Sequence, residues 1–361
     1  MSDALPEADR RPNCPHPRET VEVLGQDPAV AVYLAAADSG RVHHAWMLSG
    51  PEGVGKATLA WGIARHLAAG GTETSLPSDP ASPIFRRTAA LAEPAIALVR
   101  RAWDPDRKRL KTRIGIDEVR ALKSHFALSS VDGGWRVAIV DAADEMTPEA
   151  ANGLLKLLEE PPARAVLLLI CHRPAGLLPT IRSRCRRLTL NRLGPEDLAA
   201  ALAAFGRAGA ADPMLTILSG GSVGAAVRLL DAGGVALYER VLRLMAMMPG
   251  ADRMEMLALA EAGSADADML ELALNLFDLA LARLVRLGAG AEGPSGEIEV
   301  AAARRLVPDL AAAQGWSTLA ASLSARARHA VAVNIDPAQI LLDRLTALDA
   351  HARAPGALPF S

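Results

Sequence analysis

Residues 49–60 read SGPEGVGKATLA and decide how the first half of the chain folds. The pattern G-x-x-x-x-G-K-[ST] of a phosphate-binding loop fits Gly50, Gly55 and Lys56, with Gly53 between them. It fails at Ala57, where a Ser or Thr hydroxyl should hold Mg²⁺. The apolar stretch 44–50 before the loop predicts a strand, and 56–70 after it predicts a helix. Strand, glycine loop and helix together favour a phosphate-loop module over a chance match.

Length and composition indicate a multidomain, helix-rich protein. The chain has 361 residues, enough for two or three domains, and half of them are hydrophobic with only 3% aromatic. The apolar residues are mostly Ala, Leu and Val, and Ala and Leu are among the strongest helix formers. The net charge of −2 excludes a global basic field, so any contact with DNA must come from a local patch.

The cysteines and the N-terminus favour a cytoplasmic protein without a metal cluster. Cys14, Cys171 and Cys185 show no C-x-x-C spacing, which argues against a zinc site or a disulfide framework. Residues 1–20 lack the apolar core of a signal peptide. No stretch of about 18 uncharged apolar residues is present, so we expect no membrane contact.

Strands and helices alternate up to about residue 190, which predicts a parallel α/β domain. Thr147 is the expected N-cap of one of these helices. Beyond residue 190 only helices are expected. The expected elements after the loop are a helix at 116–128, a strand at 135–146, a helix at 147–162 and a strand at 165–170. We predict a flexible lead-in at 1–18, the α/β module at 19–189, a small helical lid at 190–236 and an all-α domain at 237–361.

Three further motifs follow the loop in order, and together they resemble a known family. They are VAIVDAADEM at 137–146, AANGLLKLLEEPP at 150–162 and IRSRCR at 181–186. In this order they resemble the clamp-loader branch of AAA+ proteins, above all the delta-prime subunits of bacterial DNA polymerase III. The motifs cover residues 19–230. The resemblance implies an AAA+ phosphate-loop module, a helical lid and a C-terminal helical collar that joins the subunits.

Four positions depart from an active AAA+ ATPase. Ala57 replaces the Mg²⁺-binding hydroxyl, and Ala142 follows Asp141 where the family's water-polarising Glu should stand. The pair 171–172 replaces the γ-phosphate sensor, and Gly224 replaces the lid arginine. Lys56 and Asp141, with the three loop glycines, would then be remnants of the nucleotide site. The resemblance therefore implies a subunit that hydrolyses no ATP and requires no cofactor; whether nucleotide still binds stays open.

The segment Ser183-Arg184-Cys185 is intact. In the resembled family this arginine reaches the ATP site of a neighbouring subunit, where it stabilises charge on the transferring phosphoryl group. The alternative is a basic surface patch, since 182, 186 and 187 are arginines too. We expect Arg184 to be the arginine finger.

The function implied is that of a stator in a hetero-pentameric clamp loader. Implied partners are the delta subunit, the gamma/tau subunits and, through the complex, the beta sliding clamp and primed DNA. The alternative is an active gamma/tau-type ATPase, which would need Ser or Thr at 57 and Glu at 142. An unrelated phosphotransferase would leave the segment at 183–185 unexplained.

Residues 100–113 read RRAWDPDRKRLKTR and hold seven basic side chains. Many relatives carry a four-cysteine zinc module in this region, and this chain has no cysteine there, so we expect no zinc and a charged loop or hairpin. The run 107–113 either contacts DNA or forms a solvated face. Glu159 and Glu160 end a helix before two prolines, so we expect a structural role for them.

Overall fold

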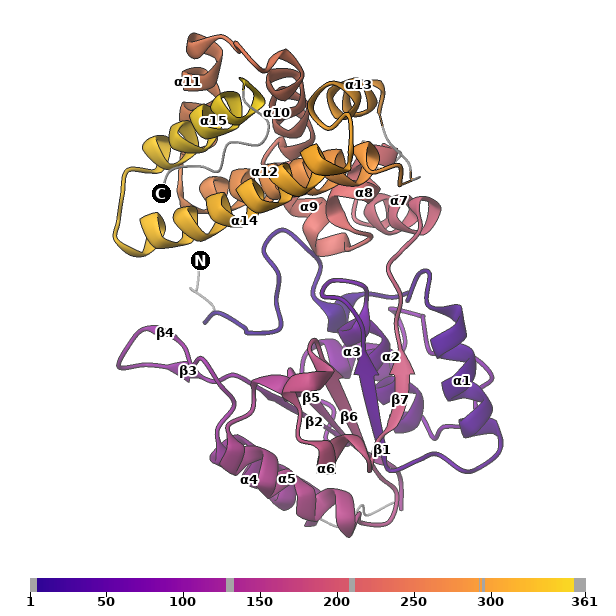
Figure 1. The fold of residues 1–361 in the computed structure, drawn as a ribbon. Coiled ribbons are helices and arrows are strands. Elements are labelled where there is room, and N and C mark those ends of the chain that lie inside the picture. Colours follow the sequence, from indigo (N-terminus) through magenta and orange to yellow (C-terminus); the bar gives the residue numbers. More distant parts are fainter. Residues whose placement is uncertain (1–4, 128–132, 208–211, 292, 294–295, 354–361) are drawn as a thin grey trace. The chain divides into compact units, whose positions relative to one another are not determined.

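The computed structural model describes residues 5–127, 133–207, 212–291, 293 and 296–353 (Figure 1). The chain divides into two compact units, Met1–Val227 and Arg228–Ser361. The boundary falls inside a helix of the segment predicted as a lid. No single described helix is long and apolar enough to cross a membrane; one bent pair, Pro213–Ser219 with Val223–Asp231, has the length and composition to do so.

The first unit is built on a five-stranded parallel sheet in the order β2-β5-β6-β1-β7. Its strands are β1 (Ala45–Ser49), β2 (Ile96–Arg100), β5 (Arg136–Asp141), β6 (Ala165–Cys171) and β7 (Arg186–Thr189). The helices of this α/β part are α1 (Asp27–Asp38), α2 (Lys56–Ala68), α3 (Pro83–Ala89), α4 (Ile116–Ala127), α5 (Pro148–Glu159) and α6 (Pro179–Arg182). Short 3₁₀ turns lie at Pro17–Glu19, Ala143–Glu145 and Pro174–Gly176. The predicted parallel α/β fold is confirmed.

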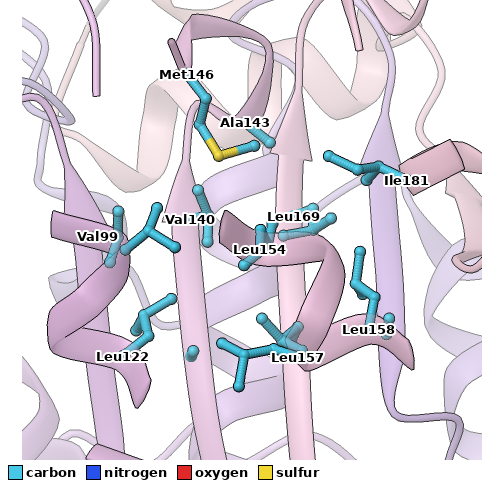
Figure 2. Close-up of a cluster of buried hydrophobic side chains, with 14 of the residues drawn as sticks. Val99, Leu122, Val140, Ala143, Met146, Leu154, Leu157, Leu158, Leu169 and Ile181 are labelled. Carbon is cyan, nitrogen blue, oxygen red and sulfur yellow. The ribbon is translucent and has the colours of Figure 1, made fainter. Parts of the chain in front are cut away.

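Helices cover both faces of the sheet, which explains why its central strands are continuous apolar runs. Every residue of β1 and β6 is buried. On one face Trp46 and Leu168 pack against α1 and α2. On the other face, Figure 2 shows Leu122 of α4 and Leu154 of α5 packed against strand residues such as Val140.

The strand register places the functional candidates at one edge. Ser49, the last residue of β1, pairs with Cys171 at the end of β6, and Arg100 pairs with Asp141 at the end of β5. The carboxyl ends of parallel strands are where open α/β sheets bind ligands. Thr147 accepts the Ala150 N–H and caps α5, as the sequence predicts.

After β7 the described part of the first unit contains helices and no further strand. These are α7 (Pro195–Ala204), α8 (Pro213–Ser219) and α9 (Val223–Asp231), the last of which crosses the unit boundary. The short strands β3 (Trp103–Asp104) and β4 (Arg109–Leu110) pair antiparallel in a hairpin between β2 and α4. A hairpin was one of the two forms expected for this basic run.

The second unit is all α within the residues described. Its helices are α10 (Gly234–Met247), α11 (Arg253–Ala262), α12 (Ala267–Gly288), α13 (Glu297–Leu306), α14 (Leu310–Ala332) and α15 (Pro337–Arg353). Helix α12 packs against α10, α13 and α14. The buried Glu299 carboxylate accepts hydrogen bonds from Tyr238 and from Arg283, so its charge is paired inside the bundle. The unit therefore has its own core.

Candidate functional site

The phosphate-type loop joins β1 to α2, as its sequence predicts, and each glycine in it has a structural reason. Gly50 lies so close to the backbone of Leu190 that a Cβ would meet its carbonyl oxygen at 2.3 Å. Gly53 has φ +76°, and a Cβ there would meet the Ser222 hydroxyl at 2.2 Å. Gly55 has φ +98° with open space around it. Left-handed φ values favour glycine, so the strand-to-helix turn alone accounts for these residues.

The Lys56 side chain folds back onto its own loop. Its ammonium donates to the carbonyl oxygens of Gly50 at 2.7 Å and Pro51 at 2.5 Å. Burial lowers the pKa of Lys56 to about 8, although Asp141 and Asp144 oppose that shift. In this arrangement the Lys56 ammonium is therefore hydrogen-bonded to carbonyl oxygens of its own loop.

A cavity of about 420 Å³ lies above this loop, within the volume range of small-molecule sites. The loop contributes Gly53 to Thr58, and the strand ends contribute Asp141 and His172. The remaining lining comes from residues 8–24 and from the helices after β7, including Phe205 and Gly224. The structure thus brings together the loop, Asp141 and the sensor positions that the sequence singled out.

The acidic strand end holds one carboxylate toward the cavity. Burial, followed by the nearby carboxylates of Asp9 and Glu145, raises the pKa of Asp141 to about 7. Ala142 is buried beside it and offers no polar group. Asp144 instead accepts the backbone N–H groups of His172 at 2.9 Å and Arg173 at 3.1 Å.

Glu145 is engaged elsewhere too, since it forms an ion pair with Arg101 at 2.8 Å. Asp144 and Glu145, the two acids past the strand end, therefore both have partners other than a reacting water. The sensor position carries neutral groups. Burial and then Lys56 lower the pKa of His172 to about 4, and burial raises the pKa of Cys171 to about 12.

The N-terminal segment, expected to be a flexible lead-in, forms a wall of the cavity from residue 8 onward. Arg100, at the end of β2, pairs with Glu7 at 2.8 Å and also with Asp9. Burial alone would raise the pKa of both acids, but the hydrogen bonds and charges of their basic partners hold it below the ordinary value. Arg11 of the same segment pairs with Glu52 of the loop.

Nothing in the sequence pattern indicated this N-terminal anchoring. The segment is rich in Pro and charge, which is typical of a disordered tail. The sequence does contain acids at positions 7 and 9 and an arginine at position 100, at the end of a strand. They are far apart in sequence, however, and no local pattern predicts that they pair. The buried ion pairs therefore emerge only from the fold.

The segment Ser183-Arg184-Cys185 follows α6 and leads into β7. The Arg184 guanidinium donates to the Thr180 carbonyl oxygen at 3.0 Å and pairs with Glu159 at 2.9 Å. Cys185 packs against the buried cluster beneath the sheet, and burial raises its pKa to about 12. Arg184 is absent from the described residues that line the cavity, so it does not serve the loop of its own chain.

Comparison with known proteins shows which family and which relatives this part of the chain resembles. The family described as DNA polymerase III, delta subunit, matches residues 25–194. The delta-prime subunit of DNA polymerase III from Pseudomonas aeruginosa is 37% identical over 201 residues, which is 53% of this chain and 56% of that protein. Residues 25–194, a little under half of the chain, are thus similar to DNA polymerase III delta and delta-prime subunits.

Other relatives are subunits of the same polymerase. The gamma/tau subunit from Mycobacterium tuberculosis is 33% identical over 187 residues, 52% of this chain and 31% of that protein. The chain thus spans about half the length, or less, of these two curated relatives. A solved gamma-subunit-related protein from Thermotoga maritima is similar at 19% identity and a TM-score of 0.45, covering 90% of this chain and 100% of that one.

Proposed function

We propose that the protein is a delta-prime-type stator of the DNA polymerase III clamp loader. In this role it hydrolyses no ATP, joins delta and gamma/tau subunits in a hetero-pentamer, and presents Arg184 to the ATP site of a neighbouring subunit. The complex would place the beta sliding clamp on primed DNA. The observation that carries the proposal is an intact Arg184 segment in a clamp-loader module whose own hydrolytic positions hold alanines.

The residues that line the cavity support the proposal that this chain hydrolyses no ATP. A phosphoryl-transfer site needs a metal ligand from the loop and a carboxylate that orients the attacking water. Position 57 offers a methyl group, position 142 is a buried alanine, and the next two acids are held by Arg173 and Arg101. Asp141 alone retains a carboxylate at the strand end.

The residues fit a bound nucleotide only in part. The cavity has the size for one, the loop precedes a helix N-terminus that would favour phosphate, and Asp141 could take part in metal binding. Against this, Lys56 is bonded to its own loop carbonyls and the metal-binding hydroxyl at 57 is missing. We therefore propose that the stator role requires no nucleotide in this chain.

The surroundings of Arg184 support a role in trans. Its side chain is 36% exposed and lies outside the lining of its own cavity, so its charge can act on another molecule. A guanidinium at a neighbour's γ-phosphoryl group would neutralise charge that builds up during transfer. The Thr180 carbonyl and Glu159 hold this group in a defined orientation before any contact is made.

One observation favours the alternative of an active gamma/tau-type ATPase. Thr58 lines the same cavity as Lys56, so a hydroxyl is present one residue after the expected place. Successive helical residues are rotated by roughly 100°, which turns Thr58 away from the direction that position 57 faces. The alternative thus requires Thr58 to hold Mg²⁺ from an unusual position.

ATP turnover by the purified chain decides between the two. The stator proposal expects no Mg²⁺-dependent hydrolysis above background, and clamp loading by the reconstituted complex that survives Lys56→Ala. Hydrolysis by the chain alone that both Lys56→Ala and Thr58→Ala abolish would establish the active ATPase instead. Arg86→Ala, an exposed arginine on α3, serves as a control for nonspecific effects of removing a cation.

A further inference from the structure

The hairpin between β2 and α4 concentrates positive charge in a protein that is otherwise slightly acidic. We call residues 101–113 the basic hairpin. It holds six Arg and Lys side chains and two Asp, a net charge of +4, whereas the whole chain carries −2. Figure 1 shows β3 and β4 extending outward from the α/β module as an arm.

Three cations of the basic hairpin are already paired. Arg101 pairs with Glu145 at 2.8 Å, Lys111 with Glu118 at 3.0 Å, and Arg107 with Asp104 at 3.9 Å. Lys108, Arg109 and Arg113 are exposed and have no carboxylate of the described residues within ion-pair distance. These three charges are therefore displayed to solvent without internal neutralisation.

The hairpin holds these cations on an ordered backbone. Trp103 pairs across the ribbon with Leu110, and the Lys111 N–H donates to the Ala102 carbonyl oxygen at 2.8 Å. The Asp104 carboxylate accepts the backbone N–H groups of Asp106 and Arg107 and so closes the turn. Because the arm is folded already, a ligand need not bear the cost of ordering it.

We propose that the basic hairpin binds the sugar–phosphate backbone of double-stranded DNA through Lys108, Arg109 and Arg113. DNA carries one negative charge per about 1.7 Å of helix axis, and cations that neutralise phosphates release its condensed counterions. Contacts of this kind position a protein without reading sequence.

An acidic protein surface fits the basic hairpin less well. The core of a protein–protein interface is depleted in charged residues and enriched in aromatic and apolar ones. Every exposed residue of the basic hairpin except Pro105 is polar or charged, while Trp103 and Leu110 are half-buried. The arm therefore offers charge without an apolar anchor.

This inference does not depend on the stator role, because it concerns a direct contact made by the chain alone. The test measures binding of the full chain to a labelled 30-base-pair duplex by fluorescence anisotropy at several NaCl concentrations. Three phosphate contacts predict a slope of log affinity against log salt of about −2.7, which is a loss of about 40-fold between 50 and 200 mM. ATP turnover, which tests the stator role, is not part of this readout.

The decisive variant is Lys108→Gln/Arg109→Gln/Arg113→Gln, which should flatten the slope by about 2.7. The matched control is Arg41→Gln/Arg86→Gln/Lys123→Gln, three exposed cations of the same unit outside the hairpin, and it should leave the slope within about half a unit of the unmodified chain. Unchanged circular dichroism spectra would show that both variants fold.

Three results would overturn the proposal. The first is an unmodified chain that binds no duplex at 50 mM salt. The second is a control variant that loses as much slope as the hairpin variant, which would indicate diffuse attraction to the whole surface. The third is equal affinity for a polyglutamate of the same charge, which would favour an acidic protein as the partner.

Discussion

The Arg184 guanidinium lies 2.9 Å from the Glu159 carboxylate, which joins the last residue of α5 to the segment after α6. The same guanidinium donates to the carbonyl oxygen of Thr180. Both side chains remain partly exposed, at 36% and 49%. An exposed ion pair of this kind contributes roughly 0–1 kcal/mol to stability, so its consequence is orientation of the arginine more than support of the fold.

Arg184→Ala should leave folding and assembly intact but depress ATP turnover at the adjacent subunit. Arginine fingers are worth about 10³–10⁵ in rate at a single site. A loader has several sites and only one would lose its finger, so the loss in the whole complex should be smaller. It should be largest in the rate stimulated by clamp and DNA. Arg184→Lys should rescue poorly, because an ammonium cannot reproduce the planar fork that contacts two phosphate oxygens.

The structure selects Arg187→Ala as the control. Arg187 is exposed on β7, whereas the Arg186 guanidinium lies 5.0 Å from the Trp46 ring and so has a packing contact to lose. Equal turnover and clamp loading by complexes with Arg184→Ala, Arg187→Ala and no substitution would reduce the segment to a basic patch.

Glu159→Gln tests whether the ion pair restrains Arg184. Without this carboxylate the guanidinium loses one of the two contacts that orient it, so turnover at the neighbouring site should fall, by at most about fivefold, the equivalent of about 1 kcal/mol. In an Arg184→Ala background the same substitution should change nothing, since its effect passes through Arg184. A Glu159→Gln effect that persists without Arg184 would assign this carboxylate another role.

Asp141→Asn should change how stability depends on pH. The pKa of Asp141 is raised from 3.8 to about 7, so folding favours its protonated form. The contribution of Asp141 to the free energy of unfolding is fully present below pH 3.8 and is lost as the pH rises through 7. The total loss is at most about 4 kcal/mol. The asparagine variant should therefore be more stable than the unmodified chain at pH 8, and the difference should vanish near pH 4. Urea unfolding at both pH values measures this, and a constant difference would contradict it.

Arg100→Met should destabilise the first unit by about 3 kcal/mol, because it leaves the Asp9 carboxylate buried without its guanidinium partner. Adding Asp9→Asn should recover part of the loss, since it removes a buried charge that would have only the His16 ring, 3.5 Å away, as a partner. Urea unfolding of the two variants provides the comparison. If the double variant is no more stable than the single one, the Asp9–Arg100 pair is not what anchors residues 7–18.

The fold of the α/β module could be predicted from the sequence because the motifs that indicate it are local. The glycines at 50, 53 and 55 imply a tight strand-to-helix turn, and Thr147 before Pro148 predicts the start of α5. The all-apolar run of β6 predicts a strand covered on both faces. Strands β2 and β7, which were not predicted, are the two edge strands, of five and four residues. Pro94 precedes the apolar run of β2, but so short a run does not distinguish a strand from a buried helix segment by its periodicity.

The sequence predicted which residues form the candidate site, but it did not predict which side chains contact one another. The loop, Asp141 and the changes at 57 and 142 follow from motif spacing, and they meet at one cavity because parallel strands share a carboxyl edge. The Arg184–Glu159 pair joins two segments 25 residues apart, and Asp9 reaches Arg100 across 91 residues. Contacts between distant side chains depend on packing geometry, which no local pattern encodes.

The all-α unit is the collar in the proposed function, and it can be removed from the chain at a defined point. The division at Val227/Arg228 lies inside α9, so a chain ending at Asp231 keeps that helix whole and removes the second unit. The two sheet-face cores lie entirely in the first unit, so the shortened chain should still fold and give a cooperative unfolding transition.

Without the second unit, the shortened chain should no longer enter a stable complex. In the proposed role that unit is the collar, which supplies the contacts to the partner subunits, and its apolar side chains Met254, Leu310 and Val333 are exposed by 70%, 65% and 52%. Size-exclusion chromatography with gamma/tau-type and delta subunits would measure the loss. The matched control is the full chain carrying Arg184→Ala, which should co-elute with those subunits because it keeps the second unit. A shortened chain that elutes in a full pentamer would place the assembly surface on the α/β module.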